Sequence, residues 1–207
     1  MRYAAAVTTG VLFLLCAVPS LAEDLNSPGW RTDPPGQETT TYQAWEFGTD
    51  DNPVNPDVDL NAFGTAVASL TGSFPVTRWH AAHEGRTGVW QFDDYILLDV
   101  PNSPEPNEYK DIWIQLTFLA EEGADPEILS QPYASEVEIV DHVQLSDTWI
   151  HGTYRVRIEP NPASELVYIM PRDCTLFVDE IVVDTICIPE PASLALLVCG
   201  ALVWRRR

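Results

Sequence analysis

Hydrophobic and polar residues alternate along much of this chain with a period of two. The alternation is clearest in residues 112–118 and 150–158. In the first of these segments, apolar residues at the even positions alternate with Trp113, Gln115 and Thr117. This pattern is typical of half-buried strands in an antiparallel sheet, where one face packs on the core and the other faces outward.

Less regular segments extend the same pattern. Residues 175–186 are apolar on both faces, which is expected of a central strand. Residues 136–145 are predicted to place four apolar side chains on one face, those of Val137, Ile139, Val143 and Leu145. Further strands are predicted at residues 42–47, 63–70, 87–92, 95–100 and 165–170. Breaks rich in proline and asparagine are predicted at residues 50–57, 101–107, 120–132 and 160–163.

The chain shows no sustained 3.6-residue hydrophobic stripe and no internal repeat. Eight or nine strands joined by long loops predict an all-β domain, an antiparallel two-sheet sandwich of the jelly-roll kind. A chain that ends in a long strand such as residues 176–183 is also loosely similar to carbohydrate-binding jelly rolls. Because such folds host many functions, this resemblance concerns the fold alone.

The first 22 residues have the parts of a secretory signal peptide. Arg2 follows the free amine, a long apolar run comes next, and a small-x-small sequence ends at Ala22. The pattern predicts a signal helix that a signal peptidase removes by cutting after Ala22. Two alternatives stay open. One is a buried first helix, and the other is a lipoprotein signal at Cys16, although Leu15 is larger than the small residue usual before a lipidated cysteine.

The other end of the chain joins three features in order. They are Pro189-Glu190-Pro191, an apolar stretch of thirteen residues at 192–204, and the cluster Arg205-Arg206-Arg207. Thirteen residues form a helix of about 20 Å, whereas the hydrocarbon of a bilayer is about 30 Å thick. The arginines are expected to stay on the cytoplasmic side. This end therefore predicts a short transmembrane-like helix that holds the chain at the membrane only before processing.

This tail closely resembles the PEP-CTERM sorting signal of exported bacterial proteins, because all three features match in order and spacing. The resemblance implies recognition by an exosortase, a membrane-embedded cysteine enzyme that cuts near the Pro-Glu-Pro motif. It also implies a Gram-negative host that makes extracellular polysaccharide. The predicted organisation is a signal peptide at residues 1–22, a flexible leader rich in proline and glycine at 23–41, a β-sandwich domain at 42–188 and the sorting signal at 189–207.

The chain is strongly acidic, with 31 Asp and Glu against 11 Lys and Arg and a formal charge of -20. Only Glu190 among the acids, and four of the bases, lie outside residues 23–188, so the exported part has 30 acids, seven bases and a charge of -23. Nucleic acids and anionic lipids are bound by clustered Lys and Arg, so this charge argues against both as partners. The 45% apolar content argues equally against a disordered acidic tail.

One acidic loop carries the pattern Asp57-x-Asp59-x-Asn61. Alternating oxygen side chains form the first half of a calcium loop, because Ca²⁺ takes six to eight oxygen ligands. A complete EF-hand is excluded, since Ala62 and Ala68 stand where Gly and Glu are required. Two interpretations stay open: a structural calcium completed by distant oxygens, or a solvated turn whose side chains bond their own backbone. No other cofactor is predicted.

Cys174 and Cys187 are the two cysteines between the predicted signals. An extended strand between them would span about 43 Å, whereas the Cα atoms of a disulfide lie within about 7 Å. A hairpin closing the pair would turn at Glu180-Ile181, which has neither Gly nor Asn. We therefore predict two free thiols.

Catalytic motifs are absent from the sequence: it has no nucleophile elbow, phosphate-binding glycine loop or dinucleotide fingerprint. His80 and His83 are three residues apart, but Thr87 stands where the zincin motif needs its second histidine after His83-Glu84, so zinc is not predicted. We predict a non-catalytic domain. A secreted glycan hydrolase is the less favoured alternative, because a glycosidase needs only two suitably spaced carboxylates.

One predicted sheet face mixes aromatic rings with hydrogen-bonding groups. It carries Trp113, Gln115, Trp149, His151, Arg155 and Arg157. Flat rings beside polar groups can hold a saccharide. The alternative is that loops cover both tryptophans and that the arginines only balance nearby acids. Whether Trp113 and Trp149 are exposed together distinguishes the two.

The sequence thus predicts an exported, non-catalytic protein of the cell surface or extracellular matrix. Its expected partners are a signal peptidase and an exosortase, with extracellular polysaccharide as the candidate ligand, and it touches the membrane only through the tail before processing. A structural or protein-binding sandwich without glycan affinity is the alternative.

Overall fold

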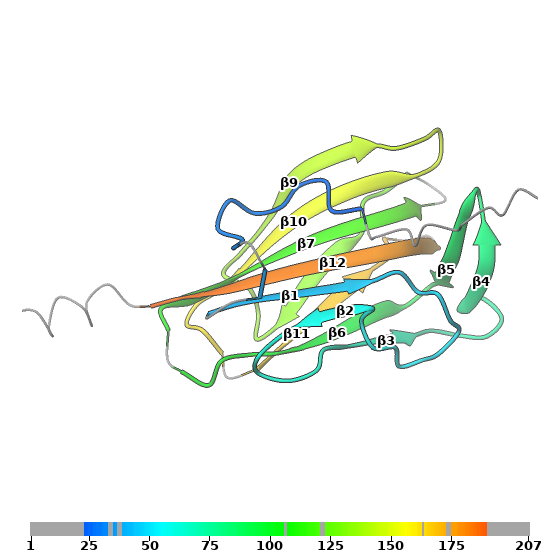
Figure 1. The fold of residues 1–207 in the computed structure, drawn as a ribbon. Coiled ribbons are helices and arrows are strands. Elements are labelled where there is room, and N and C mark those ends of the chain that lie inside the picture. The colour runs from blue at the N-terminus through cyan, green and yellow to red at the C-terminus, as the bar shows by residue number, and fades with distance from the viewer. Residues whose placement is uncertain are drawn as a thin grey trace, which may run out of the picture.

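The computed structural model describes residues 23–32, 35–36, 39–105, 107–120, 123–162, 164–172 and 175–189. The predicted signal peptide and nearly all of the predicted sorting signal lie outside these residues. The described part is all-β, and its strands form two antiparallel sheets packed as a sandwich (Figure 1). Among the described residues, no helix is long and apolar enough to cross a membrane.

The larger sheet has eight strands. Six of them lie in the order β2-β1-β12-β7-β10-β9, β5 pairs with β12 beside the end of β1, and β4 pairs with β5. Their bounds are β1 Thr40–Trp45, β2 Val58–Leu60, β4 Arg78–His83, β5 Arg86–Phe92, β7 Tyr109–Ala120, β9 Glu136–Gln144, β10 Ile150–Ile158 and β12 Leu176–Ile188.

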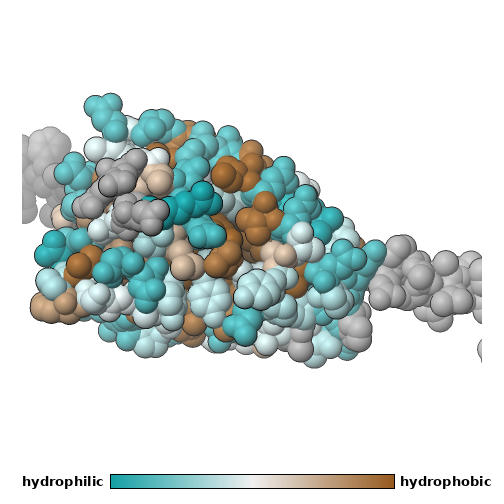
Figure 2. All heavy atoms as spheres, turned by 180° about the vertical axis from the view of Figure 1, so that it is seen from behind, coloured by the Kyte–Doolittle hydropathy of each residue, from teal (hydrophilic) through white to brown (hydrophobic). Residues whose placement is uncertain are grey.

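The smaller sheet has four strands in the order β3-β6-β11-β8 and lies behind the larger one in Figure 1. Their bounds are β3 Val67–Thr71, β6 Tyr95–Pro101, β8 Glu127–Gln131 and β11 Ser164–Met170. From behind, the molecule shows apolar side chains in separate groups within a mostly hydrophilic surface (Figure 2).

The core lies between the two sheets and is built from the alternating residues that the pattern identified. Ile112, Ile114, Leu116 and Phe118 of β7 are at most 1% exposed and pack in one cluster with Leu98 of β6 and others from the smaller sheet. The predicted strands at 112–118 and 150–158 are confirmed, and they pair antiparallel over nine residues as β7 and β10. Burying side chains of this size stabilises the fold by about 2 kcal/mol each.

Three strands, β2, β4 and β8, are not predicted by the hydrophobic pattern. β2 and β4 are short or largely polar, and β8 falls in the stretch at 120–132 that was predicted to be a break. In β8 only Ile128 and Ser130 face inward, so a single apolar residue carries the strand signal. Pairing with β11 holds this segment in a strand that its own short pattern does not predict.

The predicted common face of residues 136–145 is wrong. A bulge in the pairing of β9 with β10 lets Ile139 oppose Tyr154 while Asp141 opposes Thr153, so Val140 has no partner. Ile139 therefore faces the core side and Val143 the outer side. Every residue of β9, an edge strand of the larger sheet, is exposed.

Candidate functional site

A second bulge sets up the outer face of the larger sheet. In β12, Val178 pairs with Phe118 of β7 and Glu180 pairs with Thr117, which leaves Asp179 as the extra residue. A bulge of this kind puts two successive side chains on the same face. Val178 and Ile181 accordingly lie in the core, while Asp179 and Glu180 both face outward.

The bulge lies where β12 changes its neighbour. One end of β12 pairs with β5 through residues 176–178, and the other pairs with β1 through residues 181–186. The chain leaving β1 crosses β5 closely at Gly88, whose φ is 75° and where a Cβ atom would lie 2.6 Å from the carbonyl oxygen of Phe47. Only glycine fits this crossing.

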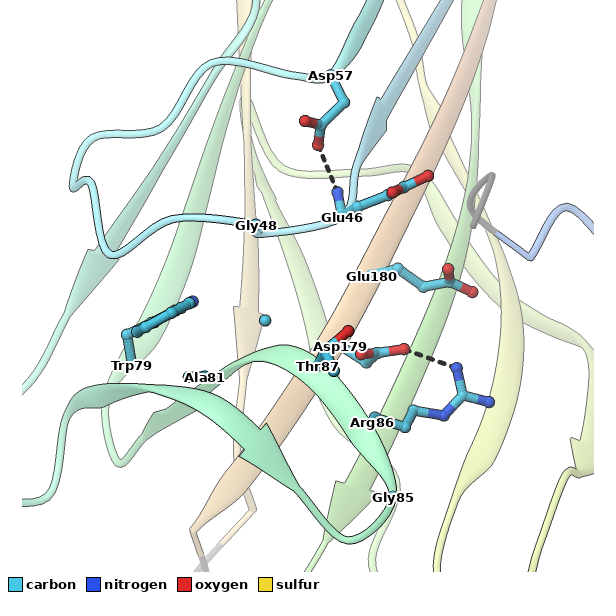
Figure 3. A pocket seen from close by; sticks show the side chains of 11 residues that line it. Glu46, Gly48, Asp57, Trp79, Ala81, Gly85, Arg86, Thr87, Asp179 and Glu180 are labelled. Atoms are coloured by element: carbon cyan, nitrogen blue, oxygen red, sulfur yellow. Dashed lines mark hydrogen bonds and ion pairs between the residues drawn. The ribbon is translucent and has the colours of Figure 1, made fainter. Parts of the chain in front are cut away.

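A pocket of about 490 Å³ opens at this junction. It is lined by Glu46, Gly48, Asp57, Trp79, Ala81, Gly85, Arg86, Thr87, Gly88, Asp179 and Glu180. Figure 3 shows the ring of Trp79 on one side, with Asp179 and Arg86 opposite it and Glu46 and Asp57 above. The pocket therefore places one aromatic wall among carboxylates and a guanidinium.

Hydrogen bonds fix several of these groups. Trp79 Nε1 donates to the carbonyl oxygen of Phe47 at 2.8 Å, which sets the plane of the ring. Arg86 Nη1 donates to Asp179 Oδ2 at 2.6 Å, and Asp57 Oδ2 accepts the backbone N–H of Glu46 at 2.7 Å. These bonds pre-organise the pocket, which lowers the entropy cost of binding a ligand there.

The leader expected to be flexible is held at its first part. Residues 23–32, here called the docking segment, lie across the outer face of the larger sheet (blue in Figure 1). Trp113 Nε1 donates to the carbonyl oxygen of Asn26 at 2.6 Å. Gln115 accepts the backbone N–H of Asn26 at 2.8 Å through Oε1 and donates to Asp24 Oδ1 at 2.6 Å through Nε2.

Arg31 anchors the other end of the docking segment. Its guanidinium forms ion pairs with Asp24 and with Asp184 of β12, and Nε donates to Asp184 Oδ1 at 2.7 Å. It also lies 5.0 Å from the centre of the Tyr42 ring. Burial raises the pKa of Asp184 to about 6 against the opposing effect of Arg31. Arg31 therefore compensates a carboxylate that would otherwise be buried alone.

The predicted saccharide face is therefore covered where the docking segment lies. Gln115, Trp149 and His151 are at most 2% exposed, so Trp113 and Trp149 are not exposed together. Trp149 Nε1 donates to the carbonyl oxygen of Glu84 at 2.9 Å, and its ring packs with Val89 and Phe177 in a second hydrophobic cluster.

The two arginines of that face balance a neighbouring acid. Arg157 binds both carboxylate oxygens of Asp111 at 2.8 and 2.9 Å, and Arg155 binds Asp111 Oδ2 at 2.8 Å. The Trp79 pocket, in contrast, is an open place where an aromatic ring meets polar groups.

A hydrogen-bond network joins Glu180 to His151. Thr117 Oγ1 donates to Glu180 Oε1 at 2.8 Å and lies 2.9 Å from His151 Nδ1, while His151 Nε2 lies 3.3 Å from Gln115 Oε1. Burial raises the pKa of Glu180 to about 7, although the Glu23 backbone N–H and the Thr117 hydroxyl oppose this. Burial also lowers the pKa of His151.

Three groups in this network lie close enough to suggest a metal. Ligand atoms of Glu23, His151 and Glu180 lie within 4.8 Å of one another. Both nitrogens of His151 already face Thr117 and Gln115, and Arg86 Nη2 holds the Glu23 carboxylate at 3.1 Å. The cluster is better described as a hydrogen-bonded ion network than as a metal centre.

The raised pKa of Glu180 predicts that the free energy of unfolding depends on pH. This prediction is for a chain that keeps Ala22, in which the nitrogen of Glu23 is an amide. Between pH 7 and about pH 4.5, Glu180 is protonated in the folded chain but ionised in the unfolded chain. The folded state therefore binds more protons, and its stability rises as the pH falls through this range. The stability of the original chain relative to Glu180→Gln should rise by about 1.5 kcal/mol from pH 8 to pH 6. His151 is present in both chains, so its contribution to the pH dependence cancels in the difference. Urea unfolding at each pH measures the difference, and a constant difference would contradict it.

The predicted calcium residues have other partners. Asp57 accepts from Glu46 N, Asp59 Oδ2 accepts from Ala66 N at 3.2 Å, and Asn61 Oδ1 accepts from Phe63 N at 2.9 Å. Asp59 Oδ1 is buried without a partner, and so is Nε2 of Gln43. These two residues are directly paired across β1 and β2. The backbone N–H bonds that Asp57, Asp59 and Asn61 accept favour the turn over the calcium loop.

We therefore expect calcium to leave the stability of the chain unchanged. The melting midpoint should agree within one measurement error in 1 mM CaCl₂ (on the order of the weakest extracellular calcium sites) and in excess chelator. A bound ion would raise the midpoint in proportion to its saturation. A clear rise with calcium that disappears in Asp59→Asn would restore the metal interpretation.

The histidine pair and one cysteine also have structural roles. The His83 ring stacks on Phe177 at 4.2 Å, and His80 Nε2 lies 2.9 Å from Gln91 Oε1. Cys187 is a free, buried thiol, as predicted, and its Sγ lies 3.1 Å from Asn102 Oδ1. Cys174 lies outside the described residues.

Comparison with known proteins adds no relative. No protein-family model matches the chain, and no curated protein or solved structure does either.

Proposed function

We propose that this chain is an exported, non-catalytic protein of the cell surface or extracellular matrix, sorted by an exosortase, whose pocket at Trp79 binds extracellular polysaccharide. Export and sorting rest on the two terminal sequence signals. We also propose that the two-sheet sandwich is of the jelly-roll kind. Binding rests on one observation: the pocket joins a fixed aromatic ring to hydrogen-bonding groups.

The chemistry of the pocket suits a neutral or cationic saccharide. A sugar presents C–H groups to an aromatic ring and hydroxyls to acceptors. Asp57 and Asp179 are such acceptors, and Arg86 offers donors beside them. A strongly anionic polysaccharide is disfavoured by four carboxylates in one lining, those of Glu46, Asp57, Asp179 and Glu180.

Trp79→Ala should lower the affinity for a bound glycan about tenfold or more, because central aromatic residues carry a large share of binding energy. A glycan array probed with the chain identifies the sugar, and titration of the best one measures the affinity. Tyr133→Ala is the matched control, since Tyr133 is 88% exposed and lies outside the pocket. It should bind as the original chain does.

Other outcomes of this experiment reject the proposal. Equal losses in both variants would place binding elsewhere. No binding to any glycan would favour the structural or protein-binding alternative, for which the exposed edge strand β9 is the specific observation. Cleavage of a bound glycan would identify a hydrolase acting through the pocket carboxylates.

A further inference from the structure

The backbone nitrogen of Glu23, the first described residue of the docking segment, lies beside the carboxylate of Glu180. Its N–H acts on the carboxylate of Glu180, lowering the pKa that burial raises, and carboxylate oxygens of Glu23 and Glu180 lie within 4.8 Å of each other. Glu180 is the buried side chain that the β12 bulge turns toward the outer face. Glu23 is also the residue that directly follows the predicted signal-peptidase site at Ala22. The first atom of the mature chain therefore lies at a buried carboxylate.

The surroundings of Glu180 hold more negative than positive charge. Glu23, Asp179 and Glu180 lie around one cation, Arg86, which binds Asp179 and Glu23. Burial lowers the pKa of the neighbouring His151, which disfavours a positive charge on that ring. Asp24 from the docking segment and Asp141 from β9 add further negative potential at His151. One more positive charge at this place would be stabilising.

Neighbouring bonds already hold the segment in register. Gln115 of β7 forms hydrogen bonds with Asp24 and Asn26, and Trp113 of β7 forms one with Asn26. Both residues that flank Leu25 are thus fixed to β7. Arg86 holds the Glu23 side chain. A new N-terminus at Glu23 would have little freedom left to lose when it binds.

We propose that Glu180 is the receptor for the α-ammonium group created when the signal peptide is removed. In the cleavage, water adds across the Ala22–Glu23 bond. Its oxygen joins the carbonyl carbon of Ala22, which leaves as a carboxylate, and the nitrogen of Glu23 becomes a free α-amine that is protonated near neutral pH. The neutral N–H that faces Glu180 thereby becomes an ammonium group, which can donate a charge-assisted hydrogen bond to this carboxylate.

This inference rests on the proposed export, because it needs cleavage after Ala22. It adds that maturation completes the fold: the processed chain docks its first residues more tightly than the precursor does. The docking can be tested on purified chains that begin at Glu23, however these are made, so its failure is distinct from a failure of export.

A single lysine makes the test sharp. Lys110 is the only lysine in the sequence and its side chain is 0% exposed, so an amine-reactive ester meets one accessible amine in the folded chain. In a chain of residues 23–207, the α-amine of Glu23 should react about tenfold more slowly when the chain is folded than when it is unfolded in urea. The reason is that ion pairing with Glu180 keeps the amine protonated. Glu180→Gln should restore most of the rate, whereas Glu138→Gln, a change of a carboxylate 52% exposed on β9, should not.

A stability cycle gives the second readout. The chain that begins at Glu23 should have an unfolding equilibrium constant about tenfold smaller than the chain that keeps Ala22, because a hydrogen bond to a charged group is the stronger one. The two chains should agree in the Glu180→Gln background. Labelling as fast in the folded chain as in urea, or a Glu180-independent difference in stability, would overturn the proposal.

Discussion

Replacing Lys110 by Met is expected to lower the free energy of unfolding by about 3–5 kcal/mol. Lys110 stands at a core-facing position of β7, two residues before Ile112, and forms an ion pair with Glu165 of β11. Both side chains are 0% exposed. The pair joins the two sheets at one end of the sandwich, and Met would leave the Glu165 carboxylate buried without a cation.

The cost is large because the carboxylate has no second partner to fall back on. Glu165 Oε2 has no hydrogen bond, and burial raises the pKa of Glu165 even with Lys110 present. A loss of this size is a large fraction of the total stability of a typical domain, which is about 5–15 kcal/mol. Urea unfolding followed by tryptophan fluorescence measures it.

The double variant Lys110→Met/Glu165→Leu is the control. Replacing both partners of a buried pair by apolar groups is often neutral or stabilising, so most of the lost stability should return. If the double variant is as unstable as Lys110→Met, the loss comes from packing around residue 110 and the interpretation as an uncompensated charge is wrong.

Arg31→Met should destabilise the chain by about 3 kcal/mol at pH 7, the low end for a buried pair because the Arg31 side chain is 14% exposed. It leaves the carboxylate of Asp184, whose side chain is 1% exposed, without its cation. It also removes the anchor of the docking segment, so a protease should cut within residues 23–39 faster than in the original chain.

The pH dependence of this loss has a definite sign. Asp184 in the variant can escape the cost of a buried charge by taking up a proton, and its pKa is already raised to about 6 with Arg31 present. The difference between Arg31→Met and the original chain should therefore shrink as the pH falls from 7 to 5. Arg172→Met changes an exposed arginine and should cost little at either pH. Equal effects of the two variants would show that Arg31 does not hold the segment.

Most of the fold follows from local pattern. Where one side of a strand is buried, as in β7 and β10, alternation identifies the strand and its inward face. The pattern is weaker at β8, where one inward position is Ser130, and at β9, where the bulge at Val140 divides the apolar side chains between two faces. Order there depends on neighbours far away in the sequence.

The site depends still more on such neighbours. Trp113, Gln115 and His151 were correctly predicted to share one outer face, but a pattern does not indicate what covers a face. The covering residue Asn26 is 89 residues from Gln115. Two consecutive acids inside an apolar run, Asp179 and Glu180, were the available signal for the bulge, since strict alternation would bury one of them unpaired.

The intact mass of the protein recovered from the cells that make it tests the central claim, that this is an exported and sorted protein, most directly. We expect a chain that begins at Glu23 and has lost Arg205-Arg206-Arg207 through a cut near Pro189-Glu190-Pro191. A mass that corresponds to the whole chain, from Met1 to Arg207, would contradict it.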